Sequence, residues 1–340
     1  MAKSGIITSQ GMPLQLSKAL DEMSKDTLAN IETEYSKVLK IESAPAGRTH
    51  YQAEYAGLDL GGEIGESEAV FYSTPVEGNP IMRGYKQYGG GFAVSDLAIK
   101  DDHWGNITGL AADLAETQQI LVELEGLKFY NEAEIGTAGS VAVVKDNKAI
   151  CAATGHNLLD PAIDFQQLGG VETAANRLYN IPITAGDLTE TTFREGFDYY
   201  NEMVSEKGYK KKMMPSQLFI SVRDQYIAHR LATQEFGGTT DLGGLDATLG
   251  NGNKSFTNSA NGFVKPWTPV VLRYLDDDRW FLMAPEHDNK LRWKEQPEQK
   301  SFYDFDHRTT RYSSVMRFGV WAYEYKATYG NITGVARSAS

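Results

Sequence analysis

The sequence contains a single cysteine, Cys151, among 340 residues, which excludes an intrachain disulfide and a cysteine-rich metal site. Cys151 lies in the apolar run AICAA, where we predict a small buried thiol rather than a nucleophile. Apolar runs approaching 18 residues are also lacking, and residues 1–12 lack the apolar core of a secretory signal. We therefore expect no membrane span and a chain that folds in a reducing cytosol.

Recognisable catalytic motifs are absent as well. The six histidines show no HExxH pairing, and no GxSxG elbow occurs. The glycine-rich runs Gly89–Gly91 and Gly237–Gly252 lack the endings and spacing of phosphate-binding loops. The aspartates of Asp276–Asp278 have no fourth ligand at a fixed spacing, so we interpret them as a turn rather than a metal site. We expect no catalytic residue, no metal and no cofactor, and a structural role.

Positive charge is missing from one long stretch. Thr49–Met82 spans 34 residues without Lys or Arg. Its six acids are Glu54, Asp59, Glu63, Glu66, Glu68 and Glu77. The stretch opens with THYQAEYAG, turns through GLDLGGEIGESE and returns through AVFYS, a pattern that predicts a hairpin with a glycine-rich, acidic tip. Because an isolated hairpin of this kind buries little surface, we expect an arm that needs surface and positive charge from a neighbouring molecule. The alternative is a mobile acidic loop on an ordinary monomer.

The overall composition is that of a globular chain. Hydrophobic residues make up 41% of it, with 14 Phe, 18 Tyr and 5 Trp, which is enough for a packed interior. The net charge of −12 disfavours nonspecific adhesion to nucleic acid. One local basic run, Lys207 with Lys210–Lys212, follows a predicted helix end. We interpret it as a solvated turn that offsets the helix dipole, with nucleic-acid contact as the alternative.

Two long elements dominate the predicted secondary structure. A helix is predicted from Trp104 to about Ile135, because apolar residues from Ile107 to Leu124 recur on one face. At about 1.5 Å per residue it would be roughly 48 Å long. Tyr312–Lys326 is predicted as a strand of about 50 Å at about 3.3 Å per residue. Elements of equal length can pack side by side as an elongated slab.

Shorter elements fill the rest of the predicted α+β pattern. A short amphipathic helix is predicted within residues 13–32, an extended segment at 35–43, and a bent strand at 84–99. The middle of the chain predicts a hairpin at 140–153, helices at 169–179, 189–207 and 223–236, a buried strand at 216–222 and a long loop at 237–262. We expect Gly208 to end the 189–207 helix, and the strands around Asp276–Arg279 to form a hairpin.

Four stretches in this order resemble a known family, the major capsid proteins of tailed bacteriophages with the Hong Kong 97 fold. They are GYKQYGGGFAVSDLAIKDDHWGN, VVKDNKAICAATGHNLLD, MMPSQLFISVRDQYIAHRLA, and the run from KPWTPVVLRYLDDDRWFLMAP to RYSSVMRFGVWAYEYKATYGN. The resemblance as a whole extends over residues 48–330. Each motif alone is weak, whereas the ordered set is specific. The nearest relatives by this resemblance are the major head subunits of Mu-like phages.

The resemblance implies a division of the chain into named parts. Residues 1–47 become the N-arm, 48–100 the E-loop and its base, 101–139 the P-domain spine helix, 140–262 the A-domain, and 263–340 the P-domain C-terminal strands and tail. The E-loop of this family overlaps an adjacent subunit. Some members cross-link an E-loop lysine to a neighbour's asparagine. Here no lysine of the arm precedes Lys86, so that chemistry is not expected.

The function implied by the resemblance is that of a structural major capsid protein. It would self-assemble from hexamers and pentamers into the icosahedral shell that encloses the double-stranded DNA of a tailed phage. It would be assembled in the host cytoplasm and located in the virion. Portal and separate scaffolding proteins are expected partners, a decoration protein is an optional one, and DNA would be packaged without sequence-specific binding. The alternatives are a tail-tube or decoration protein, or a soluble metal-dependent hydrolase.

The candidate contact residues between subunits are charged. We expect the acids of the arm to meet basic residues of an adjacent P-domain, and the DNA-facing side of the shell to be near neutral or acidic. The acidic candidates are Glu54, Asp59, Glu63, Glu66 and Glu68. The basic candidates are Arg308, Arg311 and Arg317, with Lys290, Arg292 and Lys294 as second choices.

Overall fold

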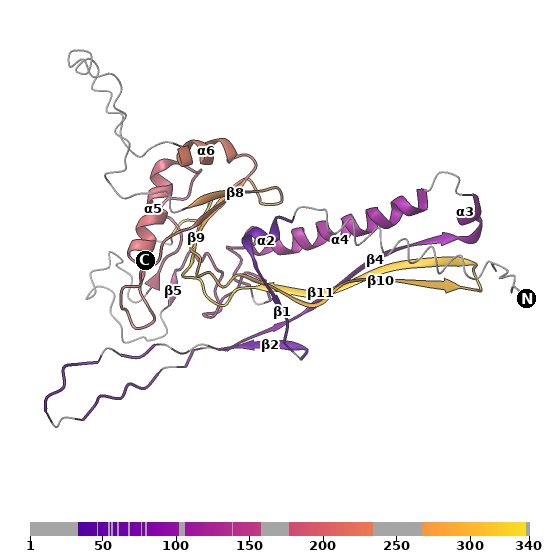
Figure 1. Ribbon diagram of the computed structural model, residues 1–340. Helices are drawn as coiled ribbons and strands as arrows, with labels where there is room; N and C mark the ends of the chain where they lie inside the picture. Colours follow the sequence, from indigo (N-terminus) through magenta and orange to yellow (C-terminus); the bar gives the residue numbers. More distant parts are fainter. Residues whose placement is uncertain are drawn as a thin grey trace, which may run out of the picture. The chain divides into compact units, whose positions relative to one another are not determined.

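The computed structural model describes residues 33–337, except for 46, 54, 56, 60, 67–68, 76, 79, 102–105, 138, 158–176 and 234–266. The helix predicted within 13–32 and the loop predicted at 237–262 lie outside the described residues. The chain divides into two compact units (Figure 1). Unit 1 comprises Met1–Tyr51, Met82–Phe129 and Asn289–Trp321, and unit 2 comprises Gln52–Ile81, Tyr130–Asp288 and Ala322–Ser340.

Unit 1 is built on a four-stranded sheet with the order β1-β10-β11-β4. Its strands are β1 (Lys40–Ser43), β10 (Lys290–Asp304), β11 (Thr309–Trp321) and β4 (Lys86–Ser95). β10 and β11 form a long antiparallel hairpin, β4 pairs antiparallel with β11, and β1 lies parallel to β10. The short helices α2 (Tyr35–Val38) and α3 (Asp96–Asp101) precede β1 and follow β4.

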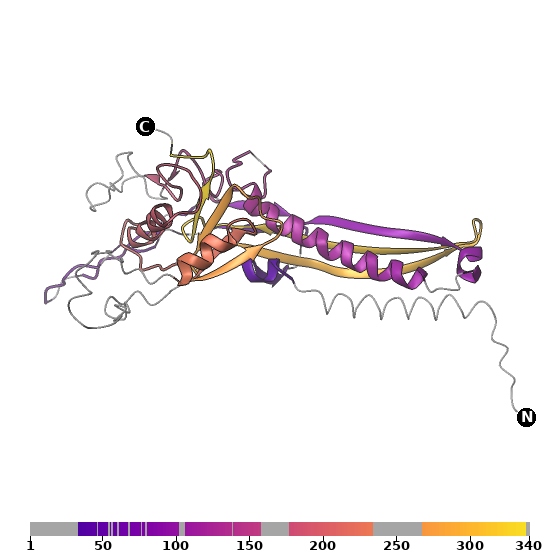
Figure 2. The same ribbon diagram turned by 90° about the horizontal axis from the view of Figure 1, so that it is seen from above.

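Helix α4 (Asn106–Asn131) runs along the long strands of this sheet, as both ribbon views show (Figures 1 and 2). The Tyr88 hydroxyl donates a hydrogen bond of 2.9 Å to Glu125 of α4. Next to it, a Cβ atom on Gly90 would meet the Gln118 and Leu114 side chains. A side chain at position 90 would have to displace the end of the Gln118 side chain, so the helix comes close to β4 at this glycine.

Buried and exposed side chains alternate along β11, and α4 covers the face with the buried ones. Tyr312, Ser314, Met316 and Phe318 are buried, whereas the residues between them point to the other face. Rings stack across the strands on the buried face, with Tyr88 and Phe318 centred 4.9 Å apart and Phe92 and Tyr312 5.0 Å apart. The opposite face of the sheet is more polar and more exposed.

The start of α2 is held on α4 by a buried carboxylate. Glu123 accepts hydrogen bonds of 2.8 Å from the backbone N–H groups of Glu34 and Tyr35. Burial raises the pKa of Glu123. A Cβ on Gly126 would sit close to Tyr35 and Leu39, so this glycine near the C-terminal end of α4 marks the place where the segment containing α2 packs on the helix.

Unit 2 contains a second four-stranded sheet with the order β12-β9-β7-β8. Its strands are β7 (Gln217–Ser221), β8 (Thr268–Leu272), β9 (Arg279–Met283) and β12 (Thr328–Ile332). Every residue of β9 and β12 is buried, so these two strands form the centre of the unit 2 core. Helices α5 (Glu190–Asn201) and α6 (Gln225–Thr233) belong to the same unit. Thr189 caps α5 through a reciprocal capping box with Thr192.

Two further strand pairs are short. β5 (His156–Asn157) pairs with β6 (Arg177–Leu178), and β2 (Thr49–Gln52) pairs with β3 (Ile81–Gly84). Residues 177–178, predicted to end a helix, are therefore a strand, while the start of that predicted helix lies outside the described residues. Within the described residues, no helix is long and apolar enough to cross a membrane.

The structure corrects two predicted helix ends. α4 ends at Asn131 rather than near Ile135, because the Arg279 guanidinium hydrogen-bonds the carbonyls of Tyr130 and Asn131 and ends the helix there. α5 ends at Asn201, so the predicted helix 189–207 is too long. Gly208 has φ of 77° but serves a tight turn beyond the helix.

The strand predictions need several corrections. Residues 35–38 of the extended segment predicted at 35–43 form α2, and residues 96–99 of the strand predicted at 84–99 belong to α3. The strands on either side of Asp276–Arg279 exist, but β7 lies between them and they do not form a hairpin. The hairpin predicted at 140–153 is reduced to one bridge, Val143 with Ala149, although Asn147 does lie at the turn with φ of 60°. The long strand predicted to end at Lys326 ends at Trp321, and its main partner β10 was not predicted.

Candidate functional site

The acidic arm, which we define as residues 49–82, is a hairpin only at its base. β2 and β3 pair there, and one further bridge joins Tyr55 to Glu77. The described residues beyond that bridge form no strand, in agreement with the glycines and carboxylates that the tip contains. The predicted strands THYQAEYAG and AVFYS are therefore much shorter than expected.

A small polar cluster ties the two limbs of the arm together. The Asp59 N–H donates to the Ser73 hydroxyl oxygen at 3.0 Å, and that hydroxyl donates to the Asp59 carboxylate at 2.6 Å. The Lys207 ammonium lies 3.1 Å from the other carboxylate oxygen of Asp59. The hydrogen bond from Ser73, and then the one from Lys207, lower the pKa of Asp59. Asp59 is thus an ionised anchor point of the arm.

The other acidic candidates are spread along the arm. Glu63 and Glu66 are exposed. Glu54 and Glu68 lie outside the described residues.

Large apolar side chains of the arm are left uncovered in the single chain. All of them are at least 48% exposed, and Tyr72 reaches 85%. They are Tyr51, Tyr55, Leu58, Ile64, Val70, Phe71, Tyr72 and Met82. Exposed apolar side chains in this number along one segment are available for contact with another molecule.

Two basic candidates lie at the β10–β11 turn. Arg308 is exposed with φ of 49°, and Arg311 is exposed with its guanidinium 2.9 Å from Asp304. Asp304 also binds His307 at 3.0 Å. Arg317 lies further along β11, half-buried and opposite Glu295 of β10. The structure therefore brings Arg308 and Arg311 close together and keeps Arg317 apart.

The second-choice basic residues are engaged within unit 1. Glu42 of β1 binds Lys290 at 2.9 Å and Arg292 at 3.2 Å. Lys294 donates to the Pro45 carbonyl at 2.9 Å. These contacts hold β1 against β10, so their first role is internal.

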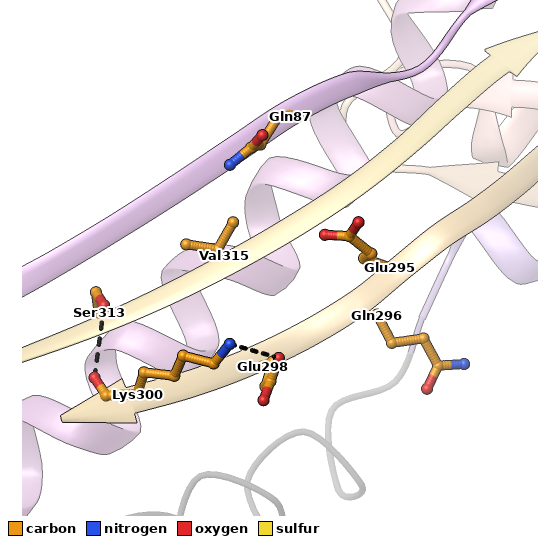
Figure 3. A pocket seen from close by; sticks show the side chains of 7 residues that line it. All are labelled: Gln87, Glu295, Gln296, Glu298, Lys300, Ser313 and Val315. Atoms are coloured by element: carbon orange, nitrogen blue, oxygen red, sulfur yellow. Dashed lines mark hydrogen bonds and ion pairs between the residues drawn. The ribbon is translucent and has the colours of Figure 1, made fainter. Parts of the chain in front are cut away.

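A shallow hollow of about 260 Å³ opens on the polar face of the unit 1 sheet (Figure 3). Glu298 and Lys300 form an ion pair of 3.1 Å along one side of it, and Val315 lies at its floor. It is lined by Gln87, Glu295, Gln296, Glu298, Lys300, Ser313 and Val315. Within the described residues, no group of histidines, cysteines and carboxylates could hold a metal ion. The hollow suits surface contact rather than catalysis.

A buried ionic cluster in unit 2 was missed by the sequence analysis. Lys145 lies 2.6 Å from both Glu206 and Glu324, and Lys326 lies 2.5 Å from the same Glu206 oxygen. Burial alone would raise the pKa of Glu206, but the charges of Lys326 and Lys145 outweigh it and lower that pKa to about 2. Lys145 and Glu206 are distant in the sequence from each other and from the neighbouring pair Glu324 and Lys326, so no local sequence pattern predicts the cluster.

His156, which lies in the stretch VVKDNKAICAATGHNLLD, is a core residue. Its ring stacks on Tyr325 with centroids 3.8 Å apart, and its Nδ1 lies 2.9 Å from Asp146. Its Nε2 lies 3.0 Å from the Ile150 carbonyl oxygen. Cys151 is buried as predicted, and that burial raises the pKa of its thiol. Neither residue is available for surface chemistry.

Comparison with solved structures defines the class of fold. A capsid structure of the cyanophage P-SCSP1u matches with a TM-score of 0.54 and 8% identity, covering 90% of this chain and 89% of that one. The mature capsid of bacteriophage PhiM1 matches with a TM-score of 0.51 and 9% identity, covering 89% and 88%. A structure from Microbacterium phage Oxtober96 matches with a TM-score of 0.50 and 11% identity, covering 89% and 91%. The fold is the Hong Kong 97 type of phage capsids.

The family follows from the sequence itself. A family model described as phage capsid protein matches residues 86–331, which is more than half of the chain. A search of the curated proteins found no match. The chain belongs to the phage capsid protein family: it is a structural component of the phage head shell and not an enzyme. This assignment decides against the tail-tube, decoration and hydrolase alternatives.

Replacing Glu206 tests the buried cluster. Glu206→Gln should lower the free energy of unfolding of the unassembled subunit by about 3 kcal/mol at pH 7, because it leaves two buried ammonium groups short of a counter-charge. The folded-state pKa lies below the ordinary 4.5, so the stabilisation is present above about pH 4.5 and is lost as the pH falls toward 2. Denaturant melts across this range should show a flatter acid limb for the variant.

Glu298→Gln is the matched control, because Glu298 and Lys300 form an exposed pair at 70% and 71% exposure. Its effect should stay below about 1 kcal/mol. Equal losses in the two variants would contradict a special role for the buried cluster.

Proposed function

We propose that this capsid protein tiles the head shell as hexamers and pentamers, and that the arm of each copy lies on a neighbouring copy. The observation that supports this most is the arm itself, which carries eight exposed large apolar side chains and no Lys or Arg. Each Å² of apolar area removed from water contributes about 25 cal/mol before entropy is deducted. Many overlapping arms would therefore hold the shell by multivalent contacts that are weak one by one.

We propose that the acids of the arm bind basic residues on the unit 1 sheet of the neighbour. The acids are Glu54, Glu63, Glu66 and Glu68, and the partners are Arg308, Arg311 and Arg317. Asp59 is a weaker acidic candidate, because Ser73 and Lys207 already bind its carboxylate. In favour of this, Arg308 and Arg311 are exposed together at the β10–β11 turn, and Glu63 and Glu66 are exposed on the arm. Lys290, Arg292 and Lys294 are weaker candidates, since Glu42 and Pro45 already bind them.

The division into N-arm (1–47), E-loop (48–100), spine helix (101–139), A-domain (140–262) and C-terminal P-domain strands (263–340) is also a proposal. The strand pairing in unit 2 changes one of these boundaries. β8, β9 and β12 pair in the sheet that contains β7, so we assign them to the A-domain and keep β10 and β11 as the P-domain strands.

The proposed partners are those that the four sequence stretches imply. They are a portal protein, a separate scaffolding protein and, optionally, a decoration protein. The same four stretches support the proposal that the nearest relatives are Mu-like major head subunits. Pull-down of purified subunits with the portal and scaffolding proteins of the same phage would test the partners one at a time.

Electron microscopy of the expressed protein tests the main proposal. We expect closed shells of megadalton mass, with pentameric and hexameric clusters resolved in the averages. A subunit that stays a small oligomer at high concentration, with scaffolding protein supplied, would contradict shell formation by this chain.

The basic candidates can be tested together. Arg308→Ala combined with Arg311→Ala should lower the yield of shells about tenfold and weaken its dependence on salt, because exposed charge contacts are screened by ions. The readout is sedimentation of assembled particles at low and high salt. Arg194→Ala on α5 is the control, since Arg194 is exposed in unit 2 and outside the proposed contact. Equal yields for the control and the double variant would remove these arginines from the interface.

We propose that packaged DNA meets a near-neutral or acidic inner surface and is held without sequence-specific contact. The net charge of −12 supports this, because counterion release by basic residues is what drives strong nonspecific binding. Purified subunits should therefore bind duplex DNA weakly, with little dependence on salt in a filter-binding assay. Tight binding that falls steeply with salt would contradict the proposal.

A further inference from the structure

Lys207 differs from the rest of its basic run. The other members, Lys210, Lys211 and Lys212, are exposed, whereas the Lys207 side chain is only 7% exposed. Its ammonium lies 3.1 Å from Asp59 of the arm. An enclosed ammonium group is costly unless a carboxylate accompanies it. The enclosure therefore points to a receptor for an acidic group rather than to a solvated turn.

A tight turn presents Lys207 in one position. The Ser205 N–H donates to the Tyr209 carbonyl at 2.7 Å, and the Tyr209 N–H donates to the Ser205 hydroxyl at 3.1 Å. Gly208 takes φ of 77°, which a side chain would strain, and its N–H donates to the Ser205 carbonyl at 3.0 Å. A preformed receptor of this kind loses little conformational freedom on binding.

The acidic partner is held just as firmly. Asp59 exchanges two hydrogen bonds with Ser73, so one of its carboxylate oxygens is occupied and the other is left for Lys207. Both limbs of the arm are thereby fixed at the point where it meets the receptor. In the single chain this anchor leaves large apolar side chains such as Leu58, Phe71 and Tyr72 uncovered.

We propose that the Asp59–Lys207 pair is exchanged between copies of this chain. In the free subunit Lys207 holds the arm of its own chain, and in the shell it holds the arm of the adjacent copy. Exchange of an identical element keeps the ion pair and allows the apolar side chains of the arm to be buried against the second copy. This inference rests on the proposed function and adds the residue that receives the arm.

Mixing two charge-reversed variants distinguishes an ion pair formed within one chain from an ion pair formed between two copies. Asp59→Lys and Lys207→Asp each place like charges together, so each variant alone should form shells at a yield about tenfold below the unchanged protein. When the two variants are mixed, the ammonium introduced at position 59 of one chain can meet the carboxylate introduced at position 207 of the other. Shells should then be recovered only if the pair forms between copies. The chain carrying both changes should also assemble.

The outcomes are distinct. Recovery in the mixture supports the exchange. Recovery in the doubly changed chain but not in the mixture shows that the pair acts within one chain and overturns it. Unchanged assembly of either single variant also overturns it, and failure of the unchanged protein to form shells overturns the proposed function instead. Lys211→Asp, an exposed member of the same run, should assemble normally.

A cross-linking measurement covers the case in which reversed charges disturb folding. Asp59→Cys chains are mixed with Lys207→Cys chains, assembled and treated with a short bismaleimide, while the native Cys151 is buried and unreactive. Dimers that contain one chain of each variant are expected in shells. Their absence from well-formed shells would overturn the exchange.

Discussion

The packing of α4 on one face of the sheet formed by β10, β11 and β4 is the constraint on which unit 1 depends. A helix of 26 residues needs a partner surface of matching length, and the 15 residues of β10 with the 13 of β11 provide it. The glycine at position 90 lets helix and strand approach, and the stacked rings of Tyr88 and Phe318 fill the space beside it. Because α4 can cover only one face, the second face of the sheet keeps the polar residues that suit contact with water or with another molecule.

The core of unit 2 differs from that of unit 1 because it encloses charged side chains. Its central strands are buried throughout, and the cluster of Lys145, Glu206, Glu324 and Lys326 brings opposite charges into that core. A hydrophobic replacement of the whole cluster at the same volume could be as stable, whereas removal of one partner alone is costly because it leaves a buried charge uncompensated. The same unit carries the tight turn with Lys207, which gives the arm a defined seat.

Local signals made much of the fold predictable from the sequence. The long helix, the bent strand with its glycines, the buried strand before α6 and the acidic arm were all indicated by periodicity, caps or charge. The predictions failed where residues distant in the sequence determine the pairing of strands. The sequence of β10 does not show the pattern of a strand because one of its faces is polar and charged. In the unit 2 sheet, β7 lies between β8 and β9 although it precedes both of them in the chain. Lys207 looked like one of four surface lysines, and only its enclosure sets it apart.

β4 is an edge strand of its sheet, and an edge strand can pair with a strand of another copy of the chain. An edge strand of ten residues offers a template for uncontrolled strand addition. The face of β4 that points away from α4 carries Gln87, Gly89, Gly91 and Ala93, so it offers little side-chain surface for packing against an added strand. Glycines at positions 89, 90 and 91 therefore weaken β4 as a strand on both of its faces.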